Sequence, residues 1–308
     1  MGTSTFAVPS LRELYYSNFE LKAVVTKPDR PAGRGKKLTP TPVKEEAIAL
    51  GLTIYQPRNS EELSAVLERL NPQLIVNVAY GMILPSKIIN FPPEGCVNLH
   101  PSLLPAYRGP NPIGRAVMNG EKVTGITVMF MSLSLDAGDI ILQEEVEIDP
   151  GEDFGSLHDR LALQGAYLLH RALTLISDGK HERTPQEEER ATYAPSFTKE
   201  DEHISWFNTA VDISNQVRAL TPSPGAYTLY RGKRFKIFKA YPCKENYNSG
   251  LEMPPGSILN LGEDFFDVVA GKGILRVTEI QLEGKKRISA EEFLRGYNLQ
   301  VGERFETP

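Results

Sequence analysis

Short apolar runs that alternate with helical patterns constrain the fold of this chain most. The runs at 22–26 and 74–79 are rich in β-branched residues and nearly continuous in apolar character. Such runs are typical of parallel strands that are covered on both faces. Further strands are expected at 95–99, 125–130 and 139–143. Alternating strands and helices over the first two-thirds predict an α/β fold with a doubly wound, mostly parallel, Rossmann-like sheet.

Helices are expected between these strands. Pro42 follows Thr41, which suits a helix start, and Gly51 suits its end. Ser60 is expected to cap a second helix that has apolar residues at helical spacing. The longest helix is predicted over 156–178, with Ser156 and Asp159 as a pair resembling a capping box.

The character of the chain changes near residue 180. Residues 179–201 are polar and contain two prolines, which indicates a connecting segment. A helix is expected near 207–219, and five short strands follow it at close spacing, at 225–230, 234–241, 256–261, 265–270 and 274–282. This spacing predicts a small C-terminal β barrel, OB-like in type. We therefore expect a domain over 1–180, a linker over 181–204 and the barrel over 205–308.

The composition is that of an ordinary globular protein. The 308 residues are 41 % hydrophobic and 24 % charged, enough for a sizeable core. Two cysteines cannot form a disulfide framework, so a reducing compartment is expected. We find no apolar run of about 18 residues and no secretory signal pattern, so we expect no membrane segment.

Positive charge is clustered on a chain whose formal net charge is −5. Residues 205–308 carry 14 Lys and Arg against 12 Asp and Glu, so the remainder carries the acidic excess. Five cations lie within 231–239 and three within 285–287, and a further cluster spans 27–44. Basic clusters on an acidic chain imply a localised anionic partner.

Three polar residues follow predicted strands and could carry chemistry. Asn98 and His100 lie two positions apart at the end of a strand, so both face one crevice at the carboxyl end of the sheet. An amide can donate to a developing oxyanion, and an imidazole can move a proton near neutral pH. Asp136 follows the next strand and could orient the imidazole or collect a proton.

Each of these features also has a purely structural interpretation. A lone His after a strand is more often a satisfied polar residue, and an Asp before Gly is more often a turn cap. The basic run 231–239 could be a solvated edge strand, and 33–37 lacks the spacing of a Walker-type phosphate loop. The other histidines have no metal-ligand spacing, so no metal is expected.

In combination these motifs resemble the folate-dependent formyltransferases. NLHPSLLPAYRG (98–109) followed by SLDAGD (134–139) is similar to the catalytic core of that superfamily. Within it, the chain resembles the methionyl-tRNA formyltransferase family along almost its whole length. The segments that carry this likeness are FAVPSL (6–11), VVTKPDRPAGRGKKLTPTPVKEEA (24–47), NVAYGMILP (77–85), ATYAPSFTKEDEHISW (191–206), VRALTPSPGAYT (217–228) and EGKKRISAEEFLRG (283–296).

The resemblance implies a role for each matched position. Asn98, His100 and Asp136 match the family's catalytic residues. The turn of Ser102, Leu103, Leu104 and Pro105 matches its tetrahydrofolate-contacting turn. The basic loop 27–38 matches the loop that engages initiator tRNA, and the C-terminal domain matches its tRNA-binding barrel. The tRNA-binding residues expected from both regions are Arg30, Arg34, Lys36, Lys37, Arg234 and Lys236.

The implied reaction moves a formyl group from 10-formyltetrahydrofolate to the α-amine of initiator methionyl-tRNA. The resemblance implies a monomer that acts in the bacterial cytoplasm rather than in an organelle. Two alternatives share parts of this pattern. A sugar-nucleotide formyltransferase would need the Asn/His/Asp core without the basic regions, and a tRNA-binding protein without catalysis would need only the basic regions. A formyl-folate hydrolase would have no evident use for the C-terminal domain.

Two positions depart from the family pattern. The family usually has an apolar strand before the Met-Gly-Thr that opens this sequence. Without that central strand, we expect exposed ladder groups and exposed apolar area, and a loss of activity if the fold fails. Asn111 and Gly114 stand where relatives commonly have Ala and Gln, which could reshape the pocket.

Overall fold

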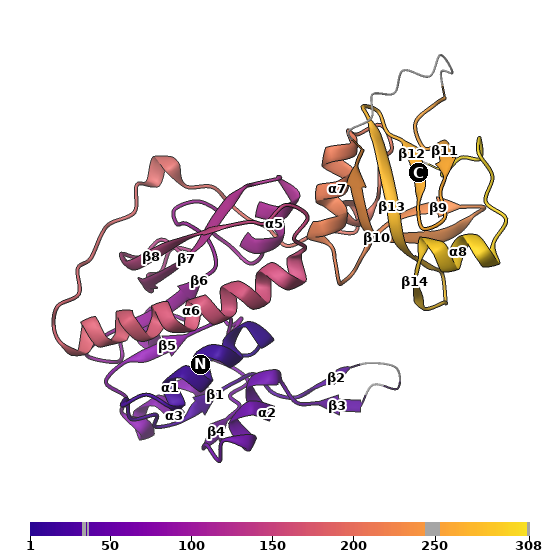
Figure 1. Ribbon diagram of the computed structural model, residues 1–308. Helices are drawn as coiled ribbons and strands as arrows, with labels where there is room; N and C mark the ends of the chain where they lie inside the picture. The colour runs from indigo at the N-terminus through magenta and orange to yellow at the C-terminus, as the bar shows by residue number, and fades with distance from the viewer. Residues whose placement is uncertain (33–34, 36, 244–252, 307–308) are drawn as a thin grey trace. The chain divides into compact units, whose positions relative to one another are not determined.

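The computed structural model describes residues 1–32, 35, 37–243 and 253–306, and they form two compact units (Figure 1). The first unit comprises Met1–Pro112, Val123–Glu147 and His158–Ala194. The second comprises Ile113–Lys122, Ile148–Leu157 and Pro195–Pro308. Two short segments of the predicted first domain thus belong to the second unit, and the boundaries at 180 and 204 stay predictions.

The sheet of the first unit is mixed. Strand β5 (Ile75–Asn77) runs parallel to β6 (Cys96–His100), whereas β7 (Val123–Phe130) and β8 (Ile140–Glu147) follow as antiparallel neighbours. A separate parallel pair consists of β1 (Val24–Val25) and β4 (Ile54–Tyr55). All five predicted strands are confirmed, but the prediction of a mostly parallel sheet is wrong for β7 and β8.

Met1 and Gly2 connect the two parts of this sheet. The Gly2 amide donates to the Val25 carbonyl at 3.0 Å, and the Val78 amide donates to the Met1 carbonyl at 2.9 Å. Gly2 also forms a parallel bridge with Val78. The spatial order across the sheet is therefore β4, β1, Met1–Gly2, β5, β6, β7 and β8.

The helices of this unit begin at residues that satisfy their free N–H groups. Helix α2 (Pro42–Ala49) starts as predicted, because the Thr41 hydroxyl accepts from the Lys44 amide at 3.1 Å. Asn59, not Ser60, caps α3 (Ser60–Leu70), since its side chain accepts from Glu62. The remaining elements are η1 (Thr5–Ala7), α1 (Val8–Tyr15), α4 (Ser86–Ile89), α6 (Phe154–Ser177) and the hairpin β2 (Arg30–Ala32) and β3 (Lys37–Thr39).

Helix α6 runs along the sheet, and the hairpin β2–β3 projects from the unit (Figure 1). The predicted pairing of Ser156 with Asp159 is wrong. Asp153 instead accepts from the Ser156 amide at 2.9 Å, so the acceptor precedes the helix. Within the part of the chain that is described, no helix is long and apolar enough to cross a membrane.

The second unit is built on antiparallel strands. Its path runs β11 (Ile258–Leu261), β12 (Phe266–Val269), β13 (Ile274–Leu282), β10 (Lys233–Pro242) and β9 (Ala226–Tyr230), and β14 (Arg287–Ser289) also pairs with β13. All five predicted strands are present, but the sheet that the described strands form is not closed, so the barrel is not confirmed. Its helices are α5 (Pro112–Met118), α7 (Ala210–Ala219) and α8 (Ala290–Gly296), and η2 (Glu188–Arg190) and η3 (Glu200–Glu202) lie in the connecting segment.

An aromatic cluster forms the core of this unit. Phe235, Phe266, Phe293 and Phe305 are fully buried and lie within ring-stacking or edge contact of one another. Trp206 stacks on Phe305 and its indole N–H donates to Thr228 at 3.0 Å, so its polar atom is satisfied. These rings hold strands from both ends of the unit together.

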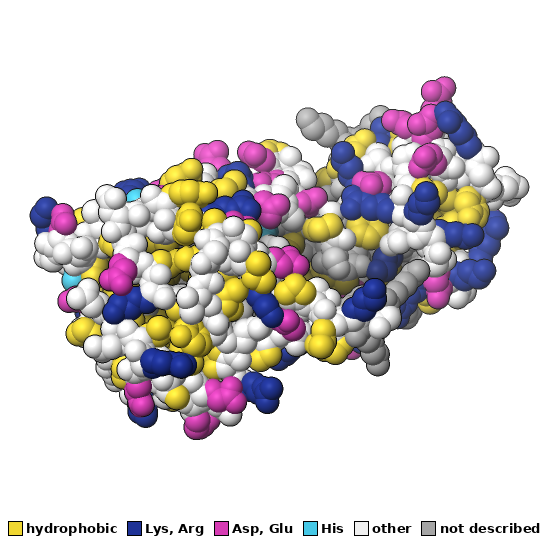
Figure 2. All heavy atoms as spheres, turned by 90° about the horizontal axis from the view of Figure 1, so that it is seen from below, with side chains coloured by type: hydrophobic (Ala, Val, Ile, Leu, Met, Phe, Trp, Pro, Cys, Tyr) yellow, Lys and Arg dark blue, Asp and Glu magenta, His cyan; other side chains and the backbone are white. Residues whose placement is uncertain are grey.

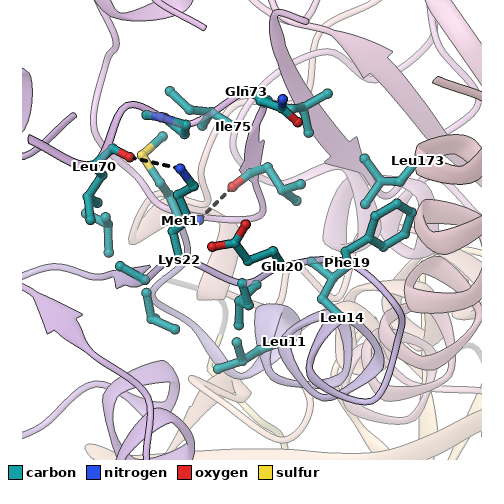
Figure 3. Close-up of a pocket in the computed structure, with 18 of the residues that line it drawn as sticks. Met1, Leu11, Leu14, Phe19, Glu20, Lys22, Leu70, Gln73, Ile75 and Leu173 are labelled. Atoms are coloured by element: carbon teal, nitrogen blue, oxygen red, sulfur yellow. Dashed lines mark hydrogen bonds between the residues drawn. The ribbon is translucent and has the colours of Figure 1, made fainter. Parts of the chain in front are cut away.

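A gap interrupts the first unit's sheet beside Met1 (Figure 3). The cavity has a volume of about 590 Å³. It is lined by the facing edges of β1 and β5 and by apolar side chains of the surrounding helices and loops, among them Leu11, Leu14, Phe19 and Leu173. Glu20, Lys22 and Gln73 also line the cavity, so its lining is mixed. This cavity is a gap between strands, and its lining does not include the residues predicted to carry chemistry.

The Met1 amino group lies in this gap, at the start of the Met1–Gly2 strand. It donates to the Val76 carbonyl at 2.6 Å. Burial lowers the pKa of this amine from 8.0 to about 6, because desolvation disfavours its charged form.

The stability of the chain should fall as the pH falls from 8 to 6. In this window the unfolded amine binds a proton that the folded amine does not, so protonation favours unfolding. Two pKa units correspond to about 3 kcal/mol below pH 6, and the effect vanishes above pH 8. Urea unfolding across this range, compared with a chain acetylated on Met1, measures the difference. The same pH dependence in both chains would contradict this assignment.

A short apolar extension engineered ahead of Met1 should stabilise the first unit. Four β-branched residues would continue the Met1–Gly2 strand between β1 and β5 and fill the cavity. We expect the melting temperature to rise by about 5 °C or more. A Gly-Ser extension of equal length is the control, because it removes the buried amine but adds no apolar side chains. Equal melting temperatures for the two extensions would contradict the assignment of the gap.

Candidate active site

Strand β6 brings Asn98 and His100 to one face of the sheet. Every residue of β6 is buried, and the strand pairs with β5 on one side and β7 on the other. Asn98 is 8 % exposed and His100 is 4 % exposed. Buried polar groups need hydrogen-bond partners, so the partners of these two side chains define what each can do.

Asn77 orients the amide of Asn98. It lies directly opposite Asn98 in the parallel ladder, and its Nδ2 donates to Asn98 Oδ1 at 3.0 Å. Since Oδ1 is the accepting end, the Nδ2 group of Asn98 remains a hydrogen-bond donor. The sequence analysis missed Asn77. Its position near the end of the strand that precedes β6 was a usable signal, but only the strand register shows that it lies beside Asn98.

The imidazole of His100 lies between a carbonyl and a carboxylate. Its Nε2 is 3.0 Å from the Tyr107 carbonyl oxygen, which can only accept, so we assign the ring hydrogen to Nε2. Its Nδ1 is 3.7 Å from Asp136 Oδ2. That separation is short enough for an ion pair but too long for a hydrogen bond. Nδ1 is therefore the nitrogen that can take up a proton beside a carboxylate.

The turn after β7 holds Asp136 in place. Asp136 has a left-handed backbone, with φ of 48°, and its Oδ2 accepts from the Gly109 amide at 2.8 Å. Gly138 permits the turn to lie close to β7, since a Cβ there would approach the Phe130 carbonyl oxygen to 1.8 Å. The structure thus brings Asp136 to His100, two residues that lie far apart in the sequence.

The turn of Ser102 to Pro105 is anchored in the sheet. Ser102 Oγ donates to the Ala106 carbonyl at 2.6 Å, and Leu104 is 3 % exposed. Leu103 lies over Gly125, where a Cβ would approach Leu103 Cδ2 to 2.3 Å. The Leu104 side chain is part of the core. Leu103 and Pro105 are half-buried.

Side chains from β7 and β8 hold the backbone of this turn. Thr127 Oγ1 donates to the Ser102 carbonyl at 2.7 Å, and Gln143 Nε2 donates to the Leu104 carbonyl at 3.0 Å. The backbone carbonyls of Ser102 and Leu104 are therefore occupied. The rigid backbone leaves the Leu103 and Pro105 side chains as the part of the turn that a ligand can meet.

The predicted basic loop forms the hairpin β2–β3. Arg30 and Lys37 are exposed on its two strands, whereas Arg34 and Lys36 lie outside the described residues. Lys44 is engaged locally, since its Nζ is 2.6 Å from Asp29 Oδ2. This hydrogen bond lowers the pKa of the Asp29 carboxyl. Of the basic residues described within 27–44, Arg30 and Lys37 are the exposed ones.

The second basic cluster lies on β10 of the other unit. Arg234 is exposed, and its guanidinium lies over the Tyr227 ring at 4.6 Å. Lys236 is half-buried and donates to the Pro224 carbonyl at 2.6 Å. Figure 2 shows dark-blue side chains gathered on the visible face of this unit. The predicted basic residues thus divide between two units.

The departures from the family pattern lie near the active-site turn in the sequence. The Asn111 amide donates to the Ala194 carbonyl at 3.1 Å, and Gly114 is buried in α5.

Among the described residues, no three His, Cys, Asp or Glu side chains gather in a cluster that could hold a metal ion.

Two family models match the chain. Residues 1–173 match the formyl transferase model, and residues 196–298 match the model of the formyl transferase C-terminal domain. Together they cover most of the sequence.

Relatives match over nearly the full length. The chain is 50 % identical to a methionyl-tRNA formyltransferase of Moorella thermoacetica, over 98 % of this chain and 97 % of that protein. It is 47 % identical to one of Pelotomaculum thermopropionicum, over 98 % and 96 % of the two chains.

Solved structures share the fold at lower identity. An N-formyltransferase of Helicobacter canadensis, in complex with folinic acid and dTDP-3-aminofucose, is 19 % identical with a TM-score of 0.68, over 91 % of this chain and 97 % of that chain. HypX of Aquifex aeolicus in complex with tetrahydrofolic acid is 20 % identical with a TM-score of 0.58, over 81 % and 43 %. At these identities the likeness establishes the fold alone.

Proposed function

We propose that Asn98, His100 and Asp136 carry out the transfer of a formyl group to methionyl-tRNA. The chain belongs to the methionyl-tRNA formyltransferase family and is a formyl-transferring enzyme. The observation that carries the assignment of the site is the buried Asn98–His100 pair on β6 with the Asp136 carboxylate 3.7 Å from the imidazole.

The formyl donor in this proposal is 10-formyltetrahydrofolate. The half-buried side chains of Leu103 and Pro105 offer apolar contact beside the catalytic strand, and the anchored turn keeps them in place. Ser102 and Leu104 support the turn from within. The donor supplies an activated carbonyl carbon, and no metal takes part in the proposed reaction.

The attacking group is the α-amine of the methionyl ester, which must be neutral to attack. A free α-amine has a pKa of about 7.7–8.0, so deprotonation is easy near neutral pH. As the amine nitrogen bonds to the formyl carbon, the carbonyl oxygen gains negative charge. Asn98 Nδ2 is the donor that Asn77 leaves free to stabilise this oxygen.

His100 and Asp136 handle the proton that the nitrogen loses. Nδ1 of His100 takes it up, directly or through water, and the Asp136 carboxylate stabilises the imidazolium that forms. The Tyr107 carbonyl keeps Nε2 protonated and so keeps Nδ1 available. The proton then passes to the leaving folate nitrogen as its bond to the formyl carbon breaks.

The acceptor is initiator methionyl-tRNA, held through its backbone by the hairpin β2–β3 and the strands around β10. The exposed cations Arg30, Lys37 and Arg234 support this, as does the clustering of positive charge on a chain of net charge −5. The sugar-nucleotide alternative receives support only from structures that establish the fold, and it gives these cations no role.

Three further assignments belong to the same proposal. The first unit is Rossmann-like. The second is a barrel of OB type, in which residues 302–306 bridge the open edges: the Phe305 amide donates to Gly256 and the Glu306 amide to Leu229, both at 2.9 Å. The enzyme acts as a monomer in the bacterial cytoplasm, and the bacterial origin of its relatives supports this setting.

Replacing Asn98 with Ala should lower kcat by about 10²–10³, because one oxyanion donor is lost. His100→Ala should abolish formylation under the same conditions. The affinity for methionyl-tRNA should stay within about two-fold. Separation of formylated from free methionyl-tRNA measures turnover, and Asn90→Ala, an exposed amide at the C-cap of α4, is the matched control. Near-normal turnover of Asn98→Ala would overturn its role, and a wild-type chain that binds tRNA without formylating it would favour the non-catalytic alternative.

Replacing Lys37 or Arg234 with Ala should weaken tRNA binding with little change in kcat. Each lost phosphate contact should flatten the slope of log K against log salt by about 0.7–0.9. Arg34→Ala and Lys36→Ala carry the same expectation. Lys87→Ala, an exposed cation paired with Glu68, is the control. Unchanged affinity across the salt titration would remove the residue concerned from the tRNA surface.

A further inference from the structure

One side chain from the segment predicted as a linker joins the two turns that hold the catalytic pair. Gln186 lies in a segment we call the strap, residues 184–194. The strap begins by bridging to β8, where Thr184 and Ile140 exchange two backbone hydrogen bonds of 2.9 and 3.0 Å. It belongs throughout to the first unit.

The amide of Gln186 uses both of its ends. Its Nε2 donates to the carbonyls of Asp136 and Gly138, both at 2.8 Å. Its Oε1 accepts from Arg108 Nε at 3.1 Å and from Arg108 Nη2 at 3.0 Å. Since carbonyls only accept and a guanidinium only donates, the orientation of this amide is fixed by its partners.

Arg108 is the residue between the two backbone groups that touch the catalytic pair. The Tyr107 carbonyl contacts His100 Nε2, and the Gly109 amide contacts Asp136 Oδ2. The Arg108 side chain is 2 % exposed, and its Nη1 also donates to both carboxylate oxygens of Glu188 at 2.8 and 2.9 Å. Movement of Arg108 would therefore displace the contacts of both His100 and Asp136.

The strap also holds this turn through the backbone. The Arg108 amide donates to the Thr192 carbonyl at 2.8 Å, and the Ala194 amide donates to the Arg108 carbonyl at 2.7 Å. The Tyr107 amide donates to Thr192 Oγ1 at 2.9 Å. The 107–109 turn is thus fixed to the strap by its backbone and to the Asp136 turn through Gln186.

We infer that Gln186 is a positioning residue that sets the distance between the His100 imidazole and the Asp136 carboxylate. It acts by fastening the 107–109 turn to the 134–138 turn. The inference rests on the proposed roles of His100 and Asp136. It assigns a part in the reaction to a segment whose composition indicates only a connection between domains.

Two substitutions separate the two ends of the amide. Gln186→Glu keeps an oxygen for Arg108 but replaces the donor with an oxygen that faces two carbonyls, so it releases the Asp136 turn. Gln186→Leu removes both contacts. Glu189→Gln, an exposed change three residues further along the strap, is the matched control.

Formylation kinetics against pH test the inference. We expect Gln186→Glu and Gln186→Leu each to lower kcat by about 10- to 100-fold, as expected for a reacting group displaced by about 1 Å, with both KM values within about two-fold. Because a more distant carboxylate stabilises the imidazolium less, the acid limb of the kcat profile should move to lower pH. In an Asp136→Asn background the same substitutions should cost less than about two-fold. Glu189→Gln should match wild type.

Different failures give different answers. Turnover of Gln186→Glu within two-fold of wild type would overturn the inference, as would an equal loss in the Asp136→Asn background, because the role would then be structural. If Gln186→Leu does not fold, Gln186→Glu, which retains the Arg108 contact, decides alone. If Asn98→Ala and His100→Ala turn over normally, the proposed site fails and not this inference alone.

Discussion

The burial of β6 is the constraint on which the site depends. All of its residues are buried, so Asn98 and His100 cannot rely on water for hydrogen bonds. Asn77 and Tyr107 supply those partners, and in doing so they fix which atoms remain for substrate: the Asn98 amide hydrogens and His100 Nδ1. The burial of β6 thus requires the same hydrogen bonds that decide which polar atoms of Asn98 and His100 stay available.

Much of the fold follows from local pattern. Continuous apolar runs marked β1 and β5, and Thr41 before Pro42 marked the start of α2, because both signals lie within a few residues. The antiparallel direction of β7 and β8 depends on connections rather than on composition, and so the sequence did not reveal it. The caps of α3 and α6 were misplaced by one to a few residues, since several polar residues precede each helix and only packing selects among them.

The site was less accessible from sequence than the fold. Asn98 and His100 could be found because strand alternation places them together, and Asp136 because a glycine-containing turn follows a strand. Gln186 could not be found in this way, because it lies in a polar segment with prolines and glutamates, a composition typical of a solvated connection. Its importance arises from four hydrogen bonds to residues about 50 and 80 positions away, which no local pattern encodes.

A buried arginine beside the proposed catalytic pair is stable only as part of a complete hydrogen-bond network. Removing a guanidinium from water is costly, and Arg108 is compensated because Gln186 and Glu188 accept from Nε, Nη1 and Nη2 together. If the strap were absent, the charge would favour solvent and would draw the 107–109 turn away from His100 and Asp136. The cost of burying Arg108 therefore makes the order of the turn conditional on the order of the strap. The arrangement proposed for catalysis thus depends on the strap, which holds the turns beside His100 and Asp136 in place.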